Sequence, residues 1–269
     1  MEISTIIGIV VGFGGILTGY LMDKGVLSAL WMLSAFITVV GGSFGALFVS
    51  YPLSQVLKLP KLFLDLFIVP KSSIGSTIEY LILLATKARQ GGLLSLEKEI
   101  NSTDKVDPFI KRGVLMVVDG TDAHKISEIL ENDIYIYETS RGASVGMLEA
   151  LGGFTPAFGM IATIVGLIMC LTAGSESPDE MTRAIGGAFT ATFYGVLLAN
   201  LFFLPAASKL KNRMSMYRME KEMVIEAVCA IRNGVNPRLL QEQLSSYYML
   251  TNGKQQQANL KSIKGDKAA

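Results

Sequence analysis

The chain has 269 residues, a formal net charge of +1 and a mean hydropathy of +0.43, and half of its residues are hydrophobic while only 17% are charged. This composition excludes an ordinary soluble domain. The low net charge hides a basic C-terminal segment, which attraction to a membrane surface is enough to explain, so nucleic-acid binding is not expected. The apolar residues occur in long blocks, so the sequence predicts an all-α, polytopic membrane protein with four transmembrane helices and a helical cytoplasmic domain.

Four uncharged runs are each long enough for a membrane-spanning helix, which needs about 20 residues. They cover residues 3–22, 29–51, 150–173 and 184–207. The first run lacks a basic leader and is followed by a second hydrophobic run, so we interpret it as a retained helix and not as a signal peptide. The predicted domains are residues 1–51 with two spans, 52–149 as a cytoplasmic helical domain, 150–207 with two more spans, and 208–269 as a cytoplasmic tail.

The basic residues give the expected orientation. Of the 24 lysines and arginines, only Lys24 and Arg183 lie outside residues 52–147 and 208–269. Cytoplasmic loops carry an excess of these residues. We therefore expect both large polar segments and both termini in the cytoplasm, with the chain in the inner membrane.

Glycine pairs four residues apart mark the first two runs. Small residues at this spacing let helix backbones approach closely where lipid provides no hydrophobic force between helices. Chance in a glycine-rich chain explains any single pair, but three pairs favour close packing, within the chain or between copies. The pairs are Gly8 with Gly12, Gly15 with Gly19, and Gly41 with Gly45.

The segment between the second and third runs is predicted to be helical. One helix begins where Ser76 and Glu79 have the spacing of a capping box and ends at Gly91 and Gly92, and a second begins near Leu94. A third has apolar residues at helical spacing from about residue 126, and no strong stop signal separates it from the third run. We expect one long helix that continues into the membrane.

The tail is predicted to contain two helices. The first is an amphipathic segment at 214–232, which is followed by a break at "NGVNP" and then by a second helix. The polar residues after about 251 are expected to be disordered.

No acidic, basic or histidine residue lies within any of the four runs. Ion paths through membranes usually contain ionisable side chains, so a protein of this kind that conducts ions needs a carboxylate from another chain. Its own polar groups in the last two runs are few, and each threonine hydroxyl can instead bond to its own helix backbone. They are Thr155, Thr163, Thr190, Thr192 and Asn200.

Pro156 and Pro205 remove helix hydrogen bonds near the cytoplasmic ends of these runs, where they mark helix termini or free carbonyls for a polar path. Enzyme activity is not expected, because the sequence has one histidine, no evident nucleophile or metal cluster and no phosphate-binding glycine loop.

Arg89 and Glu97 stand at the end of one predicted helix and at the start of the next. The helix dipole favours a cation at the first position and an anion at the second, so local stability alone explains both charges.

Four strings resemble the family of ion-driven membrane proteins that contains MotA, TolQ and ExbB. They occur in the expected order and span nearly the whole chain, and the four predicted runs match the flagellar stator branch, since TolQ and ExbB have three. The strings are "ARQGGLLSLE", "LGGFTPAFGMIATIVGLI", "TFYGVLLANLFFLP" and "NGVNPRLLQEQL".

The resemblance implies a homo-oligomer, a pentamer in the family, around the single helices of a MotB-type partner whose aspartate binds the ion. It further implies that Arg89 and Glu97 face the rotor protein FliG. Pro156 and Pro205 match prolines associated with conformational coupling, and Thr163 and Thr192 match threonines near the ion path.

A threonine at position 163 is more typical of sodium-driven relatives, so the resemblance leaves the permeating ion as H⁺ by default or Na⁺, with no other cofactor. Two alternatives stay open: a TolQ-like or ExbB-like energiser of an envelope process, and a membrane scaffold that conducts nothing.

Overall fold

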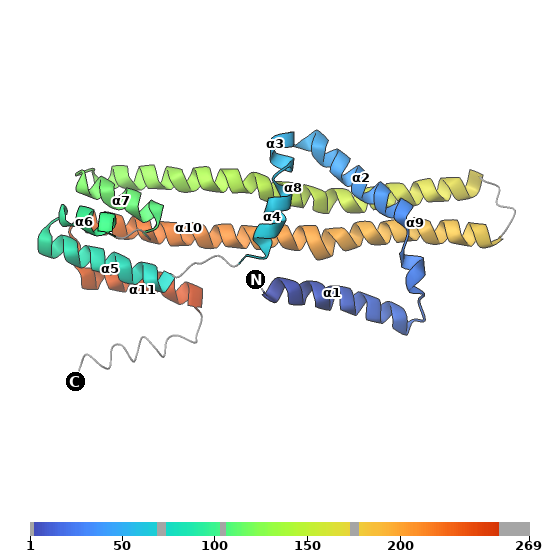
Figure 1. Ribbon diagram of the computed structural model, residues 1–269, viewed down its shortest axis with the longest axis horizontal. Coiled ribbons are helices and arrows are strands. Elements are labelled where there is room, and N and C mark those ends of the chain that lie inside the picture. The colour runs from blue at the N-terminus through green and yellow to red at the C-terminus, as the bar shows by residue number, and fades with distance from the viewer. Residues whose placement is uncertain (1–2, 69–73, 103–105, 173–177, 253–269) are drawn as a thin grey trace. The chain divides into compact units, whose positions relative to one another are not determined.

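The computed structural model describes residues 3–68, 74–102, 106–172 and 178–252, and every regular element in these ranges is a helix (Figure 1). The predicted all-α class is therefore confirmed. The elements are α1 (Ile3–Met22), η1 (Leu27–Leu30), α2 (Leu33–Ser50), α3 (Leu53–Val56), α4 (Leu59–Leu66), α5 (Ile74–Gly91), α6 (Ser95–Ser102), α7 (Pro108–Val118), α8 (Ala123–Thr172), α9 (Pro178–Leu198), the π turn η2 (Ala199–Phe203), α10 (Leu204–Arg232) and α11 (Pro237–Asn252).

Four helical runs in the described part of the chain are long and apolar enough to cross a membrane. The long helix expected to enter the third span is confirmed as α8, which has 50 residues. The fourth run continues without a break from Pro178 to Arg232 through the π turn, so the expected tail helix at 214–232 is the end of a longer helix. The expected disorder after about residue 251 concerns residues 253–269, which lie outside the described ranges.

Two helix starts differ from the sequence prediction. The second span was expected from residue 29, but a short 3-10 helix precedes a break at Trp31 and Met32, and the backbone N–H of Met32 donates to the hydroxyl of Tyr194 (3.1 Å). Ser76 lies inside α5, so it is not the N-cap of that helix. The predicted stop is present, because Gly92 adopts a φ of +76°, which favours glycine.

The chain forms two compact units, one of residues 1–70 with 140–213 and the other of residues 71–139 with 214–269. Helices α8 and α10 contribute residues to both units.

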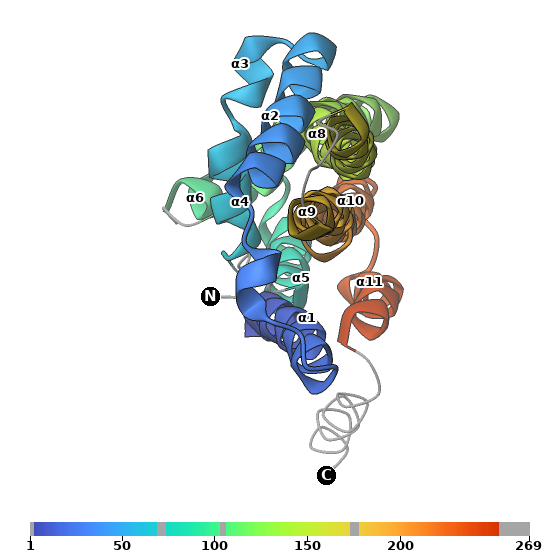
Figure 2. The same cartoon turned by 90° about the vertical axis from the view of Figure 1, so that its right-hand side faces the viewer.

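In the first unit, the end of α8 lies beside α9, and α2 packs against α9 (Figure 2). Ala35 and Val39 of α2 form a small buried cluster with Ala191. Helix α1 buries none of its residues within the chain. Much of the apolar surface therefore faces outward, as expected for helices that contact lipid or other chains.

The second unit has a conventional buried core made by α5, α6, α7, α11 and the parts of α8 and α10 that belong to it. Of the five apolar positions at helical spacing in this part of α8, Ile126, Leu130 and Ile134 are buried in this core, and Ile129 and Tyr137 are half-buried. Tight helix ends stabilise its edges: Asp107 accepts from the backbone N–H of Phe109 at the start of α7 (2.8 Å), and Gly234 has a φ of +69° after α10.

Candidate functional site

Helices α8 and α9 approach each other backbone to backbone. A Cβ atom built on Gly159 would lie 3.1 Å from the carbonyl oxygen of Ala191 and 3.2 Å from the Cα atom of Thr192. A Cβ atom on Gly195 would lie 3.1 Å from the Cα atom of Pro156 and closer still to the carbonyl oxygen of Thr155. Only glycine allows this approach, because the opposing atoms belong to rigid backbone.

Thr163 and Thr192 meet across this contact. Their hydroxyl oxygens are hydrogen-bonded to each other, and both side chains are half-buried. The Thr163 hydroxyl also lies 2.8 Å from the carbonyl oxygen of Ala188 and 3.0 Å from that of Gly159, which is 3.5 Å from the Thr192 hydroxyl. The cluster contains two hydroxyl protons and four oxygen atoms, so it has more hydrogen-bond acceptors than donors.

The other polar groups of these helices bond to the backbone, as the alternative reading of the sequence allowed. The Thr155 hydroxyl donates to the carbonyl of Leu151 (2.9 Å), and Asn200 donates to the carbonyl of Val196 (2.9 Å). Thr190 donates to Gly186 (2.9 Å). The structure thus selects the pair Thr163 and Thr192 from the five predicted polar residues.

The two prolines occupy different settings. Pro156 lies inside α8, next to the Gly195 contact, where it leaves one carbonyl of the preceding turn without its usual donor. Pro205 follows the π turn, in which the N–H of Leu204 donates to the carbonyl of Ala199. Neither proline ends its helix, so both are internal irregularities of continuous helices.

Arg89 and Glu97 lie on either side of the tight turn between α5 and α6, and both are exposed. The turn is fixed by Ser95, whose hydroxyl donates to the carbonyl of Gly92 (2.7 Å), and by an ion pair between Lys87 and Glu99. Among the ion pairs of the described residues, none includes Arg89 or Glu97. Their charges are therefore presented to the surroundings by a rigid turn.

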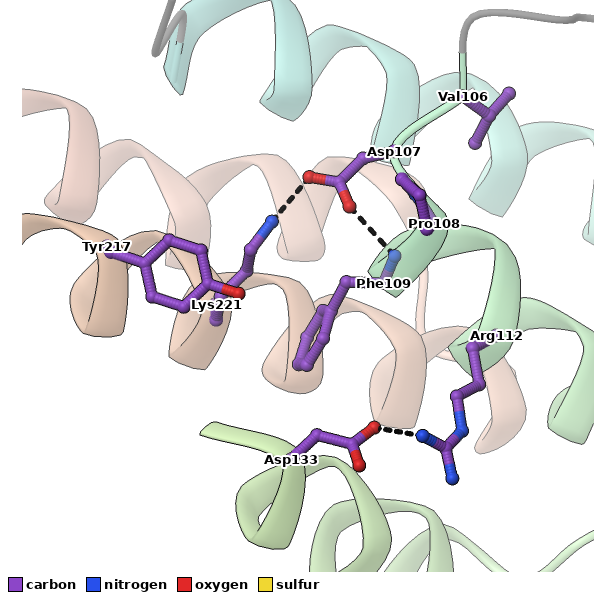
Figure 3. A pocket seen from close by; sticks show the side chains of 8 residues that line it. All are labelled: Val106, Asp107, Pro108, Phe109, Arg112, Asp133, Tyr217 and Lys221. Carbon is purple, nitrogen blue, oxygen red and sulfur yellow. Dashed lines mark hydrogen bonds and ion pairs between the residues drawn. The ribbon is translucent and has the colours of Figure 1, made fainter. Parts of the chain in front are cut away.

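A buried lysine with a partly exposed carboxylate partner, which the sequence did not predict, lies elsewhere in the second unit (Figure 3). Lys221 of α10 is only 4% exposed and pairs with Asp107. Its ammonium group lies 5.2 Å from the ring centre of Phe109 and 5.1 Å from that of Tyr217. Arg112 and Asp133 form a second ion pair beside it. Both basic groups are already paired, so this pocket is a structural ion-pair network.

Burial is the main cause of the raised pKa of Tyr217, to about 12, and the phenol of Tyr137 and nearby carboxylates add to it. The two tyrosine rings stack with their centres 4.0 Å apart. The described residues contain no group of three His, Cys, Asp or Glu side chains that could hold a metal ion.

Most of the glycines predicted to pack helices have no neighbour within the chain. A Cβ atom on Gly12 would meet the side chain of Leu201, whereas on Gly8, Gly15, Gly19, Gly41 and Gly45 it would meet nothing within 4 Å. Packing of these five glycines between copies stays a prediction.

Apart from Gly12, the glycines of the described residues that pack within the chain were missed by sequence reasoning. A Cβ atom on Gly152, Gly159 or Gly166 would meet residues of α9 or α10. These three are spaced by seven residues, which places them on one face of α8. The seven-residue spacing in the sequence could therefore have predicted this packing face of α8.

Comparison with known proteins gives consistent matches. Residues 101–223 match the model of the MotA/TolQ/ExbB proton channel family, and residues 6–92 match the model of the motility protein A N-terminal region. Motility protein A of Borreliella burgdorferi is 36% identical over 249 residues, which are 92% of this chain and 94% of that protein.

Two solved structures are similar over most of their length. The MotAB structure from C. jejuni has a TM-score of 0.85 and 29% identity, covering 92% of this chain and 96% of that one. The flagellar MotAB stator complex from Bacillus subtilis has a TM-score of 0.82 and 31% identity, covering 89% and 93%.

Proposed function

This chain belongs to the MotA/TolQ/ExbB proton channel family, and on that premise we propose that it is a stator subunit of the bacterial flagellar motor that works with a MotB-type partner. Members of this family are channel subunits and not enzymes, which agrees with the sequence prediction. The match of the N-terminal region to motility protein A supports the motor over a TolQ-like or ExbB-like energiser.

The observation that carries the proposal is the oxygen cluster at the α8–α9 contact. Thr163, Thr192 and two backbone carbonyls converge there, in predicted runs that contain no Asp, Glu, Lys, Arg or His. The oxygens of this cluster can coordinate a cation or accept a hydrogen bond from a protonated carboxyl group, but they cannot neutralise the charge of a cation. A partner's aspartate that faces this cluster would supply the missing charge.

The driving ion follows from the same cluster. Protons are the default for the family, and Na⁺ becomes competitive where hydroxyl and carbonyl oxygens replace part of the ion's hydration shell. Thr163 and Thr192 offer such oxygens, so sodium dependence is the property that needs to be measured. No cofactor other than the permeating ion is required.

Torque is proposed to arise in three steps. Ion binding neutralises the partner's aspartate, which lowers the cost of exposing it to the apolar faces of α8 and α9. The ring of this protein, expected to be a pentamer, then steps around the partner. The step reaches the exposed charges Arg89 and Glu97, which engage complementary charges on the rotor protein FliG.

The expected setting is the inner membrane, with both termini in the cytoplasm. Lys24 and Arg183 are the only basic residues outside the two large polar segments, and this asymmetry supports the orientation.

The test is to express the chain with its MotB-type partner in a motile host that lacks its own stator, and to measure swimming in sodium-containing and sodium-free media. We expect wild type to restore motility, and Arg89→Glu and Glu97→Lys to reduce it without loss of the assembled complex. Lys98→Glu, an exposed change next to Glu97, is the matched control. Full motility of both reversal variants would refute rotor contact through this turn.

A sodium dependence that disappears in Thr163→Ala would assign Na⁺ to the cluster. An assembled wild-type complex that never restores motility would refute the stator proposal and favour an envelope energiser.

A further inference from the structure

The C-terminal end of the short helix α4 is held by arginines from two long helices. Arg213 of α10 donates to three carbonyls, those of Asp65 (2.6 Å), Leu66 (3.0 Å) and Ile68 (2.9 Å). The last carbonyls of a helix lack donors within the helix, and a cation is favoured at this end. Arg141 of α8 adds an ion pair to the carboxylate of Asp65 (3.4 Å).

The opposite contact of α4 is with the π turn. The ring of Phe63 stacks on Phe202 with centres 5.1 Å apart and lies 6.3 Å from the ring of Phe203. Leu59, Leu62 and Leu66 of α4 are buried, so the helix is packed along one whole face and not attached at its end alone.

These contacts lie on both sides of Pro205. Phe202 and Phe203 precede the proline, and Arg213 follows it by two turns. The π turn and Pro205 lie between these two contacts. This is the most easily deformed part of the helix from Pro178 to Arg232, because the π turn pairs residues five apart instead of four and proline lacks an N–H group. Helix α4 therefore contacts the long helix both before and after the irregular turn.

We propose that Phe63 and Arg213 are positioning residues, which through α4 hold the α9–α10 helix in a fixed direction across the π turn and Pro205. A change of direction at Pro205 must then shift α4 or break its contact with Phe202 or with Arg213. Only the predicted effect on motility rests on the proposed stator function; the effect on helix dynamics does not.

The alternative is that Arg213 only caps α4. In that case its removal would loosen α4 and leave the π turn unchanged. The two alternatives differ in the hydrogen exchange that they predict for residues 196–206.

The test uses the full chain with its MotB-type partner in lipid nanodiscs and measures hydrogen–deuterium exchange of peptides covering 59–68 and 196–206. The variants are Arg213→Gln and Phe63→Leu, with Lys211→Gln as the matched control. Lys211 lies on the same helix and pairs with Glu149 of α8, not with α4. Arg213→Lys, which keeps the cation, guards against a variant that fails to fold.

We expect exchange at 196–206 to be roughly tenfold faster in Arg213→Gln and in Phe63→Leu, because a charge-assisted set of hydrogen bonds or a stacked ring is lost. Arg213→Lys should fall between wild type and Arg213→Gln, and Lys211→Gln should match wild type. The first two variants should also swim more slowly with a normal amount of complex.

Faster exchange at 59–68 with unchanged exchange at 196–206 would overturn the proposal and leave Arg213 as a cap. If wild type restores no motility but the exchange pattern is as expected, the proposed stator function is refuted, whereas the proposed role of Phe63 and Arg213 is supported.

Discussion

Replacing Gly195 by alanine tests whether the close α8–α9 contact is required. The new Cβ atom would lie 3.1 Å from the Cα atom of Pro156 and nearer to the carbonyl oxygen of Thr155, whereas ordinary contacts are 3.4–4 Å. The contact with the carbonyl oxygen is the limiting one, so the helices must separate by about 1 Å, which forfeits up to about half of the dispersion energy of the contacting atoms. Overpacking of this kind costs about 1–3 kcal/mol, more than alanine gains from helix propensity, up to about 1 kcal/mol.

The assay is thermal unfolding of the purified complex, followed by motility. Gly186→Ala is the matched control, because it lies on the same helix and its Cβ atom would meet nothing within 4 Å. The change in stability of Gly186→Ala therefore reports only the gain in helix propensity when alanine replaces glycine. We expect Gly195→Ala to be about 1–3 kcal/mol less stable than Gly186→Ala. Equal stability of the two variants would refute the claim that backbone contact between α8 and α9 demands glycine at this position.

Two further predictions concern the second unit. Asp107→Asn keeps an oxygen for the cap of α7 but removes the charge that pairs with buried Lys221. Because the Asp107 side chain is 37% exposed, solvent screens the pair, so the loss of stability should be about 1–3 kcal/mol, and Asp107→Asn with Lys221→Met should recover most of it in a denaturant melt. Tyr217 has a pKa raised to about 12, above the usual value near 10, so the stability it contributes is complete below pH 10 and is lost as the pH rises toward 12. Tyr217→Phe should therefore flatten the fall of melting temperature between pH 10 and 12, and an unchanged slope would contradict the assigned shift.

The fold was largely readable from the sequence because its main signals are local. Uncharged runs of about 20 residues identify the spans, and the lack of a stop signal after Ile134 predicts the continuous helix α8. The exposure of Arg89 and Glu97 also follows from local patterns, because both flank a glycine turn between amphipathic helices.

The parts that were missed depend on partners far apart in the chain. Lys221 looks like one basic residue of an amphipathic helix, and nothing near it in sequence reveals that Asp107 pairs with it in a buried setting. The π turn has the same character. Pro205 signals an irregularity, but the sequence does not say whether the helix ends, kinks or widens, since this depends on packing against residues distant in the chain.

The glycines show that a pair of small residues predicts a helix contact only where the surface of another helix lies against it. Pairs four apart were sought in the first two spans, yet α1 buries no residue within the chain and most of those glycines touch nothing in it. The glycines of α8 and α9 touch opposing backbone, and they do so beside Thr163 and Thr192. Close approach of the two backbones brings the two hydroxyls within hydrogen-bonding distance, so the glycines at 159 and 195 support the oxygen cluster that the threonines form.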